Sequence, residues 1–183
     1  MARGERMVCG VGDDRVPVES RPRPGGVPLA PGCVAPLFAL PDADMAPFDL
    51  RDAISQNVVV LCFYPRDGTP ACTRQAIEFS DHESDFSAAG AVVVGISPDD
   101  CLTHAAFRDE HGISIRLLSD PDMEVCRLYG VLHRREGCER DIVRRTTVVL
   151  DRAGVVRHLI DDVQLRGHAA EVLKLVREIA RNR

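Results

Sequence analysis

Two uninterrupted apolar runs, NVVVLCFYP at 57–65 and AVVVGIS at 91–97, restrict the fold of this chain more than any other feature. Both runs are rich in β-branched residues, and an apolar run without polar alternation is typical of a strand buried on both faces of a largely parallel sheet. Apolar residues at helical spacing predict helices over 72–90 and 97–112. Because strands alternate with helices, the sequence predicts an α/β protein.

Shorter elements predicted from the same patterns complete the chain. They are a β-hairpin at 36–50, a strand at 113–120, a short helix at 121–130 with Pro121 at its first position, a polar loop, a β-hairpin at 145–160 and an amphipathic helix at 166–181. This order predicts a thioredoxin-like fold, in which a central mixed β-sheet is flanked by helices and preceded by an N-terminal β-hairpin.

Length and charge favour one globular domain without a nucleic-acid or membrane partner. The 183 residues are 45% hydrophobic, which is enough for one core, and we expect residues 28–183 to form that domain. Residues 1–27 are rich in Pro, Gly and Arg, so we expect a disordered extension. A net charge of −5 offers no basic face to a phosphate backbone, and no apolar run approaches the roughly 20 residues that span a bilayer. Since the first residues also lack the apolar core of a secretory signal, we expect a soluble, cytoplasmic protein.

Seven cysteines are spread along the chain, at positions 9, 33, 62, 72, 101, 126 and 138. An odd number cannot all pair within one chain, and their spread through a core-forming sequence fits a reducing compartment. No two are spaced as C-x-x-C, and neither they nor the six histidines form the close ligand pairs of a structural zinc site. We therefore expect neither a metal site nor a bound cofactor.

Cys72 has the setting of a reactive cysteine. It follows a buried strand, a short loop and a proline, and it opens a predicted helix whose unpaired backbone N–H groups point toward the sulfur. Such groups favour the thiolate, which is the nucleophilic form of cysteine. Pro65 and Thr69 precede it with the spacing P-x-x-x-T-x-x-C, inside the string FYPRDGTPACT. This setting alone also leaves open a buried structural cysteine.

The string resembles the active-site motif of the peroxiredoxin family. With GISPDD, LLSDPD, YGV and RTTVVLDRAG further along, the sequence is similar to the bacterioferritin comigratory protein, or peroxiredoxin Q, branch from about Val34 onward. The resemblance implies a thiol-dependent peroxidase that reduces hydrogen peroxide and organic hydroperoxides through a Cys72 sulfenic acid. It further implies that Thr69 hydrogen-bonds the peroxide, that Pro65 shields the sulfur, and that Arg145 holds the thiolate and orients the peroxide.

Each of these residues also has an alternative role. Thr69 is a suitable helix cap, and Pro65 is a suitable strand terminator. Arg145 stands next to Arg144, which could equally be the functional arginine. Two other functions stay open: a thiol–disulfide oxidoreductase on the same fold, which normally needs two closely spaced cysteines, and a redox sensor that signals to a partner.

The thiol that resolves the sulfenic acid is not evident from the sequence. In many relatives of this branch it lies five residues after the nucleophile, where this chain has Ile77, and in another subgroup it lies at the position of Arg108. Cys101, two helical turns before Arg108 and on about the same face, is the first candidate. Cys138, in the arginine-rich segment HRREGCER, is the second. Otherwise an external thiol, from thioredoxin, glutaredoxin or glutathione, must reduce Cys72. The resemblance to this branch also implies a monomer or weak homodimer.

Overall fold

The computed structural model describes residues 29–134, 141–161 and 163–181. The extension predicted over residues 1–27 lies outside the described residues, and so does Cys138. Within the described part, no helix is both long and apolar enough to cross a membrane.

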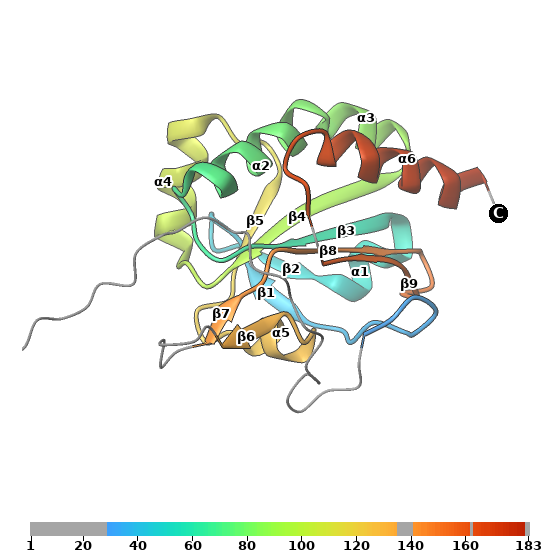
Figure 1. The fold of residues 1–183 in the computed structure, drawn as a ribbon, viewed down its shortest axis with the longest axis horizontal. Coiled ribbons are helices and arrows are strands. Elements are labelled where there is room, and N and C mark those ends of the chain that lie inside the picture. The colour runs from blue at the N-terminus through green and yellow to red at the C-terminus, as the bar shows by residue number, and fades with distance from the viewer. Residues whose placement is uncertain (1–28, 135–140, 162, 182–183) are drawn as a thin grey trace, which may run out of the picture.

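The described helices and strands follow one another along the chain, as coloured in Figure 1. Their order is β1 (Ala39–Pro41), β2 (Pro47–Asp49), α1 (Leu50–Gln56), β3 (Val58–Phe63), α2 (Pro70–Asp81), α3 (Glu83–Ala88), β4 (Ala91–Ser97), α4 (Cys101–His111), β5 (Arg116–Ser119), α5 (Glu124–Leu128), β6 (Leu132–Arg134), β7 (Asp141–Val143), β8 (Thr146–Leu150), β9 (Val156–Ile160) and α6 (His168–Arg181).

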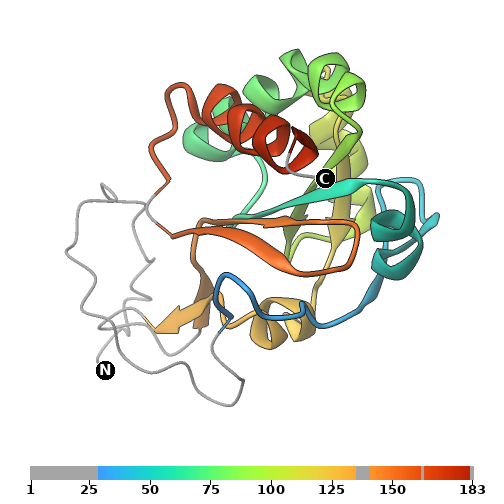
Figure 2. The same ribbon diagram turned by 90° about the vertical axis from the view of Figure 1, so that its right-hand side faces the viewer.

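A five-stranded mixed sheet in the order β5-β4-β3-β8-β9 forms the centre of the molecule. Strands β3, β4 and β5 run parallel, whereas β8 is antiparallel to β3 and β9 is antiparallel to β8. Helices α2, α3 and α6 cover one face, and α1, α5 and two small hairpins lie on the other (Figures 1 and 2). The predicted thioredoxin-like fold is confirmed, and the predicted N-terminal hairpin is the short β1–β2 pair.

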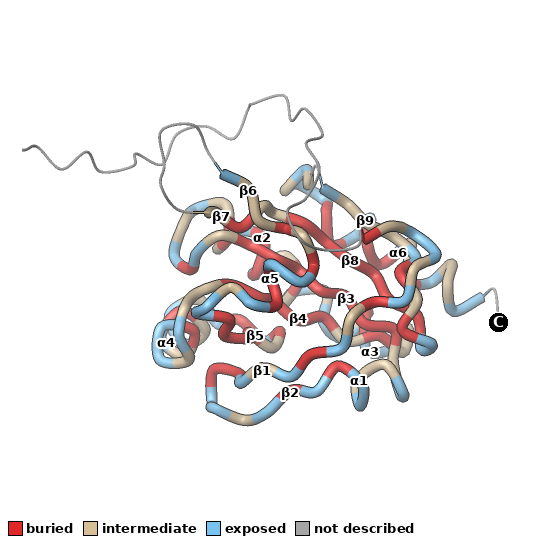
Figure 3. The backbone as a smooth tube through the Cα atoms, turned by 90° about the horizontal axis from the view of Figure 1, so that it is seen from below, coloured by how far each residue is buried: buried red, intermediate tan, exposed pale blue. Residues whose placement is uncertain are grey.

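The central strand β3 is buried over its whole length, as its uninterrupted apolar sequence predicts. In Figure 3 the strands at the centre of the sheet carry the colour of buried residues. Alternate residues of β3 face opposite layers: Val58, Val60 and Cys62 pack in the cluster under α2, α3 and α6, and Val59, Leu61 and Phe63 pack in the cluster that includes α1 and α5. The sheet thus separates two apolar cores, and α2 is held on one of them.

The single helix predicted over 72–90 is in fact two helices, α2 and α3, and α2 begins two residues earlier than predicted. His82 lies between them with φ −101° and ψ 5°, and its backbone N–H donates to the carbonyl of Phe79, three residues back. Both helices bury their apolar residues in the same core, where the rings of Phe79 and Phe86 lie 5.8 Å apart. The helical spacing of apolar residues therefore continues past His82, and it gives no sign that the helix breaks there.

The short helix predicted to open at Pro121 instead begins at Glu124. Pro121 lies in a turn, and Met123 has a φ of 53°, a left-handed conformation that a right-handed helix does not contain. The carboxylate of Asp120 accepts hydrogen bonds from two backbone N–H groups in the first turn of α5, at 3.3 and 2.8 Å. This carboxylate, rather than the proline, sets the start of the helix.

Neither α1 nor the β6–β7 hairpin is predicted from the sequence. Helix α1 has seven residues, too few for a periodic pattern, and it begins where the Asp49 carboxylate accepts from the N–H of Arg51 at 2.8 Å. Strands β6 and β7 have three residues each and lie in the segment predicted as a polar loop, where Leu132 pairs with Val143. Elements this short depend on tertiary contacts more than on local pattern.

Two substitutions on α2 test the assignment of its buried face. Phe79 is fully buried against α3 and α6, so Phe79→Ala should lower the free energy of unfolding by about 3–5 kcal/mol. Ile77, on the outer side of the same helix, is 37% exposed, and Ile77→Ala should cost less than about 1 kcal/mol. Denaturant unfolding followed by circular dichroism measures both, and similar losses for the two variants would contradict the assignment.

Candidate active site

The register of β3 and β8 brings two distant parts of the chain to one edge of the sheet. These antiparallel strands pair Phe63, the last residue of β3, with Thr146, the first residue of β8. The chain leaving β3 therefore starts at the place where the chain entering β8 arrives. Residues 64–69, here called the cysteine loop, leave that edge and lead into α2, and Arg145 directly precedes β8.

Cys72 lies in the first turn of α2, as predicted, and its side chain is buried. Thr69 is the N-cap residue, and its Oγ1 accepts a hydrogen bond from the backbone N–H of Cys72 at 3.4 Å. Pro70 occupies the start of the helix, where its missing N–H costs nothing. The Cys72 residue is only 2% exposed, and its sulfur lies at the helix end where the peptide dipoles favour negative charge.

Arg145 is the arginine that contacts this sulfur. Its Nη2 donates to Cys72 Sγ at 3.2 Å, and its Nη1 donates to Oε1 of Gln75. Gln75 lies three residues after Cys72 on the same face of α2, so one guanidinium contacts two successive turns of the helix. The neighbouring Arg144 pairs instead with Asp161, at 4.0 Å. Of the two arginines that the sequence leaves open, the structure brings Arg145 to the thiol.

Thr69 and Pro65 lie on the cysteine loop at opposite ends. The Thr69 hydroxyl caps α2 and also donates to the carbonyl of Arg66 at 3.4 Å, so the helix-capping role anticipated as an alternative is present. Pro65 is half-buried and follows β3 by two residues. As the N-cap residue, Thr69 holds its side-chain oxygen within one helical turn of the Cys72 sulfur. A hydroxyl that caps a helix can also form a hydrogen bond with a ligand.

Sequence reasoning did not single out Gln75, which completes the contact with Arg145. It is 3% exposed, and its Nε2 is buried without a hydrogen-bond partner in the described part of the chain. A buried amide that is half satisfied is unusual, and this one lies beside a buried thiol and an arginine. The only signal in the sequence is its spacing of three residues from Cys72.

The other described cysteines have different surroundings. Burial raises the pKa of the Cys62 thiol to about 12, and the hydrogen bond with Thr147 and the charge of Arg145 oppose that rise only in part. Burial likewise raises the pKa of Cys126 far above its usual range. Cys101, at the first position of α4, is half-buried and borders a hollow of about 830 Å³. Cys62 and Cys126 are therefore protonated core residues at neutral pH, and Cys101, which like Cys33 is half-buried, is more accessible than either.

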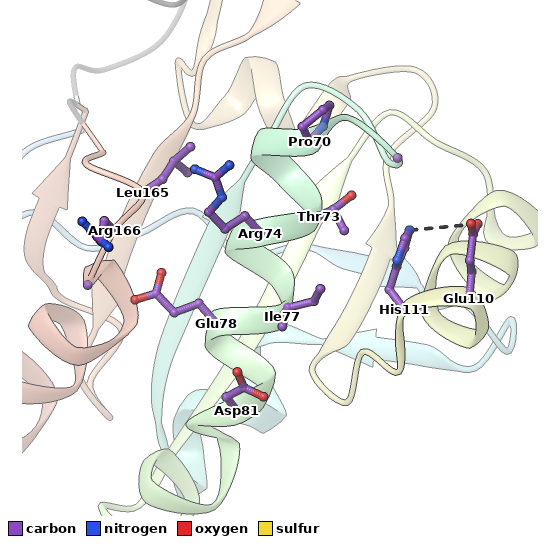
Figure 4. A pocket seen from close by; sticks show the side chains of 12 residues that line it. Pro70, Thr73, Arg74, Ile77, Glu78, Asp81, Glu110, His111, Leu165 and Arg166 are labelled. Carbon is purple, nitrogen blue, oxygen red and sulfur yellow. Dashed lines mark ion pairs between the residues drawn. The ribbon is translucent and has the colours of Figure 1, made fainter.

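The two positions that hold a resolving cysteine in relatives of the peroxiredoxin Q branch have other surroundings in this chain. Ile77 lies on the outer face of α2, where an open groove of about 760 Å³ runs between the end of α4 and the segment before α6 (Figure 4). The groove begins near Pro70 and Thr73 and ends near Asp81. Arg108, on α4, is bound to the carboxylate of Asp44 at 2.8 Å. Neither position supplies a thiol to the site.

Comparison with known proteins agrees with this geometry. The model of the AhpC/TSA family matches residues 31–159, a range that contains both the thiol and its arginine. The chain belongs to the AhpC/TSA family. Peroxiredoxin Bcp of Escherichia coli K12 is 36% identical over 155 residues, which cover 84% of this chain and 99% of the relative.

Solved peroxiredoxin structures share the fold over the same region. The crystal structure of peroxidoxin BcpB from Mycobacterium tuberculosis matches with a TM-score of 0.76 at 33% identity, over 82% of this chain and 98% of that chain. A bacterioferritin comigratory protein of Xanthomonas campestris, whose structures were described in terms of its alkyl peroxide reduction activity, matches with a TM-score of 0.74 at 30% identity, over 78% and 92% of the two chains. This peroxiredoxin is thus a thiol-dependent peroxidase.

Substitution of the two adjacent arginines tests which one serves the reaction. Arg145→Lys keeps the charge but cannot donate to both the sulfur and Gln75 in one plane, so the rate constant for peroxide reduction should fall about 100-fold or more. Arg144→Lys, next to it, should stay within about threefold of the wild type because Arg144 makes a partly exposed ion pair. Stopped-flow measurement of peroxide consumption distinguishes them, and equal losses would contradict the assignment.

Proposed function

We propose that Cys72 is the nucleophile of the peroxidase reaction. The thiolate sulfur attacks one oxygen of the peroxide, the O–O bond breaks, and the other oxygen leaves with a proton as water or an alcohol. The sulfur is oxidised to a sulfenic acid and the peroxide is reduced. The observation that carries this proposal is the 3.2 Å hydrogen bond from Arg145 to a sulfur that lies buried at the start of α2.

Arg145, Thr69 and Pro65 are proposed to act together on the peroxide. The guanidinium stabilises the sulfur before attack and the charge that moves to the leaving oxygen during it. The Thr69 hydroxyl accepts from the Cys72 N–H, and it can turn its hydrogen from the carbonyl of Arg66 to a peroxide oxygen beside the sulfur. Pro65 at the other end of the loop limits the access of water and of larger thiols. Hydrogen peroxide and organic hydroperoxides are the proposed substrates.

For the second half of the cycle we propose a thiol that reaches Cys72 only after α2 has locally opened. The Cys72 residue is only 2% exposed, so a second thiol has no room to approach its sulfenic acid along the line of the S–O bond. Cys101 is the proposed internal resolving residue among those described, because the cysteine loop is bonded to the turn before α4: the N–H of Asp67 donates to Asp99 Oδ2 at 2.8 Å. Cys138 stays the second candidate.

The reductant that completes the cycle is proposed to be an external thiol, from thioredoxin, glutaredoxin or glutathione. Such thiols are available in a reducing cytoplasm, where we place the protein because five described cysteines are all unpaired. We further propose a monomer or weak homodimer, since large exposed apolar side chains of the described residues are few: Val34, Leu37, Met45, Ile77, Leu102 and Leu128.

Loss of the nucleophile is the direct test of the proposed function. Cys72→Ser should abolish the burst of peroxide consumption that one equivalent of reduced protein shows in a rapid-mixing experiment. Cys126→Ala is the matched control, since it removes another buried thiol that lies in the opposite core, and it should leave the burst rate within about threefold. A burst that persists in Cys72→Ser would assign the reaction to another residue.

Mass spectrometry of the oxidised protein tests the resolving thiol. After one equivalent of peroxide, we expect a disulfide that joins the Cys72 and Cys101 peptides. A sulfenic acid lacks the negative charge of the thiolate, so its bond to Arg145 is weaker and the start of α2 opens more easily. In Cys101→Ser the same peptide should instead carry a free sulfenic acid that an added dithiol reduces. A disulfide from Cys72 to Cys138, or none in the wild type, would contradict the role of Cys101.

A further inference from the structure

A buried polar network lies beneath the cysteine loop, and the reaction described above does not use it. Its centre is Asp67, which is 8% exposed. One carboxylate oxygen, Oδ1, accepts from the hydroxyl of Tyr64 at 2.8 Å, and the other, Oδ2, lies 2.7 Å from Nδ1 of His104. The backbone N–H of the same residue donates to Asp99. Asp67 is thus the point at which the loop is attached to the rest of the fold.

His104 contributes the longest link of this network. It lies on α4, 37 residues further along the chain, and is fully buried. Its Nε2 lies 3.1 Å from the carbonyl oxygen of Leu118 in β5, and since a carbonyl can only accept, Nε2 carries a hydrogen. The imidazole therefore spans from β5 to the loop, with one ring nitrogen on each. Because both ring nitrogens are held, the imidazole fixes the distance between β5 and the cysteine loop.

Tyr64 holds the same carboxylate from the other side. Its side chain follows β3 directly and is almost completely buried, and burial, with Asp67 beside it, raises the pKa of the phenol well above its usual value. The hydroxyl keeps its hydrogen and donates it to Asp67. With a hydrogen-bond partner on each oxygen, the Asp67 side chain has one orientation open to it.

The position of Asp67 within the cysteine loop lets this network affect the groups around Cys72. Asp67 lies two residues after Pro65 and two residues before Thr69, the residues at the two ends of the loop that shields and caps Cys72. A shift of about 1 Å in such a group is enough to lower a rate by about two orders of magnitude. The attachment point of the loop therefore controls the alignment of the groups that surround the sulfur.

We propose that His104 is a positioning residue for the peroxidase reaction, acting through Asp67 on the cysteine loop without touching the sulfur. This inference rests on the proposed role of Cys72. It goes beyond that role because it assigns a kinetic effect to a buried side chain on a different helix. The network does not take part in bond breaking, and no proton of His104 is transferred to the peroxide.

Two amide substitutions separate the two hydrogen bonds of His104. Asn places a side-chain N–H near the position of Nδ1 and can keep the donor to Asp67, while Gln places one near Nε2 and can keep the donor to Leu118. We expect His104→Gln to lower the rate constant for oxidation of Cys72 by peroxide roughly 10- to 100-fold, and His104→Asn to stay closer to wild type, within about threefold. His158→Gln, on the edge strand β9, is the matched control.

A second readout distinguishes positioning from loss of stability. Alkylation of Cys72 by iodoacetamide, followed on its peptide by mass spectrometry, does not require the alignment of Thr69 and Arg145 with a peroxide. In His104→Gln a loosened loop should leave alkylation unchanged or make it faster while peroxide oxidation slows. If both reactions change in parallel with the unfolded fraction, or if the Asn and Gln variants lose equally, the positioning role is wrong.

Tyr64→Phe provides a test if His104→Gln fails to fold. It removes only the hydroxyl that donates to Asp67 and keeps the ring in the core, and peroxide oxidation of Cys72 should slow about threefold to tenfold. An unchanged rate in a folded Tyr64→Phe would overturn the proposal. If instead wild-type Cys72 is not oxidised at all, the proposed nucleophile fails, which is a different outcome.

Discussion

We propose that the activity of this peroxiredoxin depends above all on the hydrogen bond between Arg145 and the sulfur of Cys72. A buried thiolate without a partner would be costly, and the thiol would stay protonated in an apolar core. Cys62 shows that alternative, because it packs in the core under α2, α3 and α6 and burial raises its pKa to about 12. What separates the two cysteines is position: Cys72 stands at a helix start and faces a guanidinium, and Cys62 stands within a strand.

The fold makes that contact through the sheet. The pairing of Phe63 with Thr146 sets the cysteine loop and Arg145 at one edge, although about half of the domain lies between them in sequence. Packing of α2 on the central core then fixes the height of the sulfur above the sheet. The loop itself is held by Asp67 and His104 from below, so its conformation depends on α4 and β5 as well. Strand pairing, the packing of α2 and the attachment of the loop to α4 and β5 thus together position the sulfur of Cys72.

Much of this arrangement could be predicted from the sequence, because it is encoded locally. Continuous apolar runs identify β3 and β4, and a strand, a loop and a proline in succession place Cys72 near the start of a helix. The sequence could not distinguish Arg144 from Arg145, because the two are identical neighbours. Only the path of the chain between β7 and β8 decides which of them faces α2. Gln75 and His104 were also not identified, because their partners lie 70 and 37 residues away and only the folded chain brings them together.

The selectivity of Cys72 for peroxide tests the account most directly. If Arg145 and the loop align a peroxide with the sulfur, wild-type Cys72 should react with hydrogen peroxide far faster than its reactivity toward iodoacetamide would suggest. Measured at one pH, the ratio of the two rate constants should exceed that of free cysteine by roughly 1,000-fold or more. A ratio equal to that of free cysteine would show an ordinary thiol and would contradict the account.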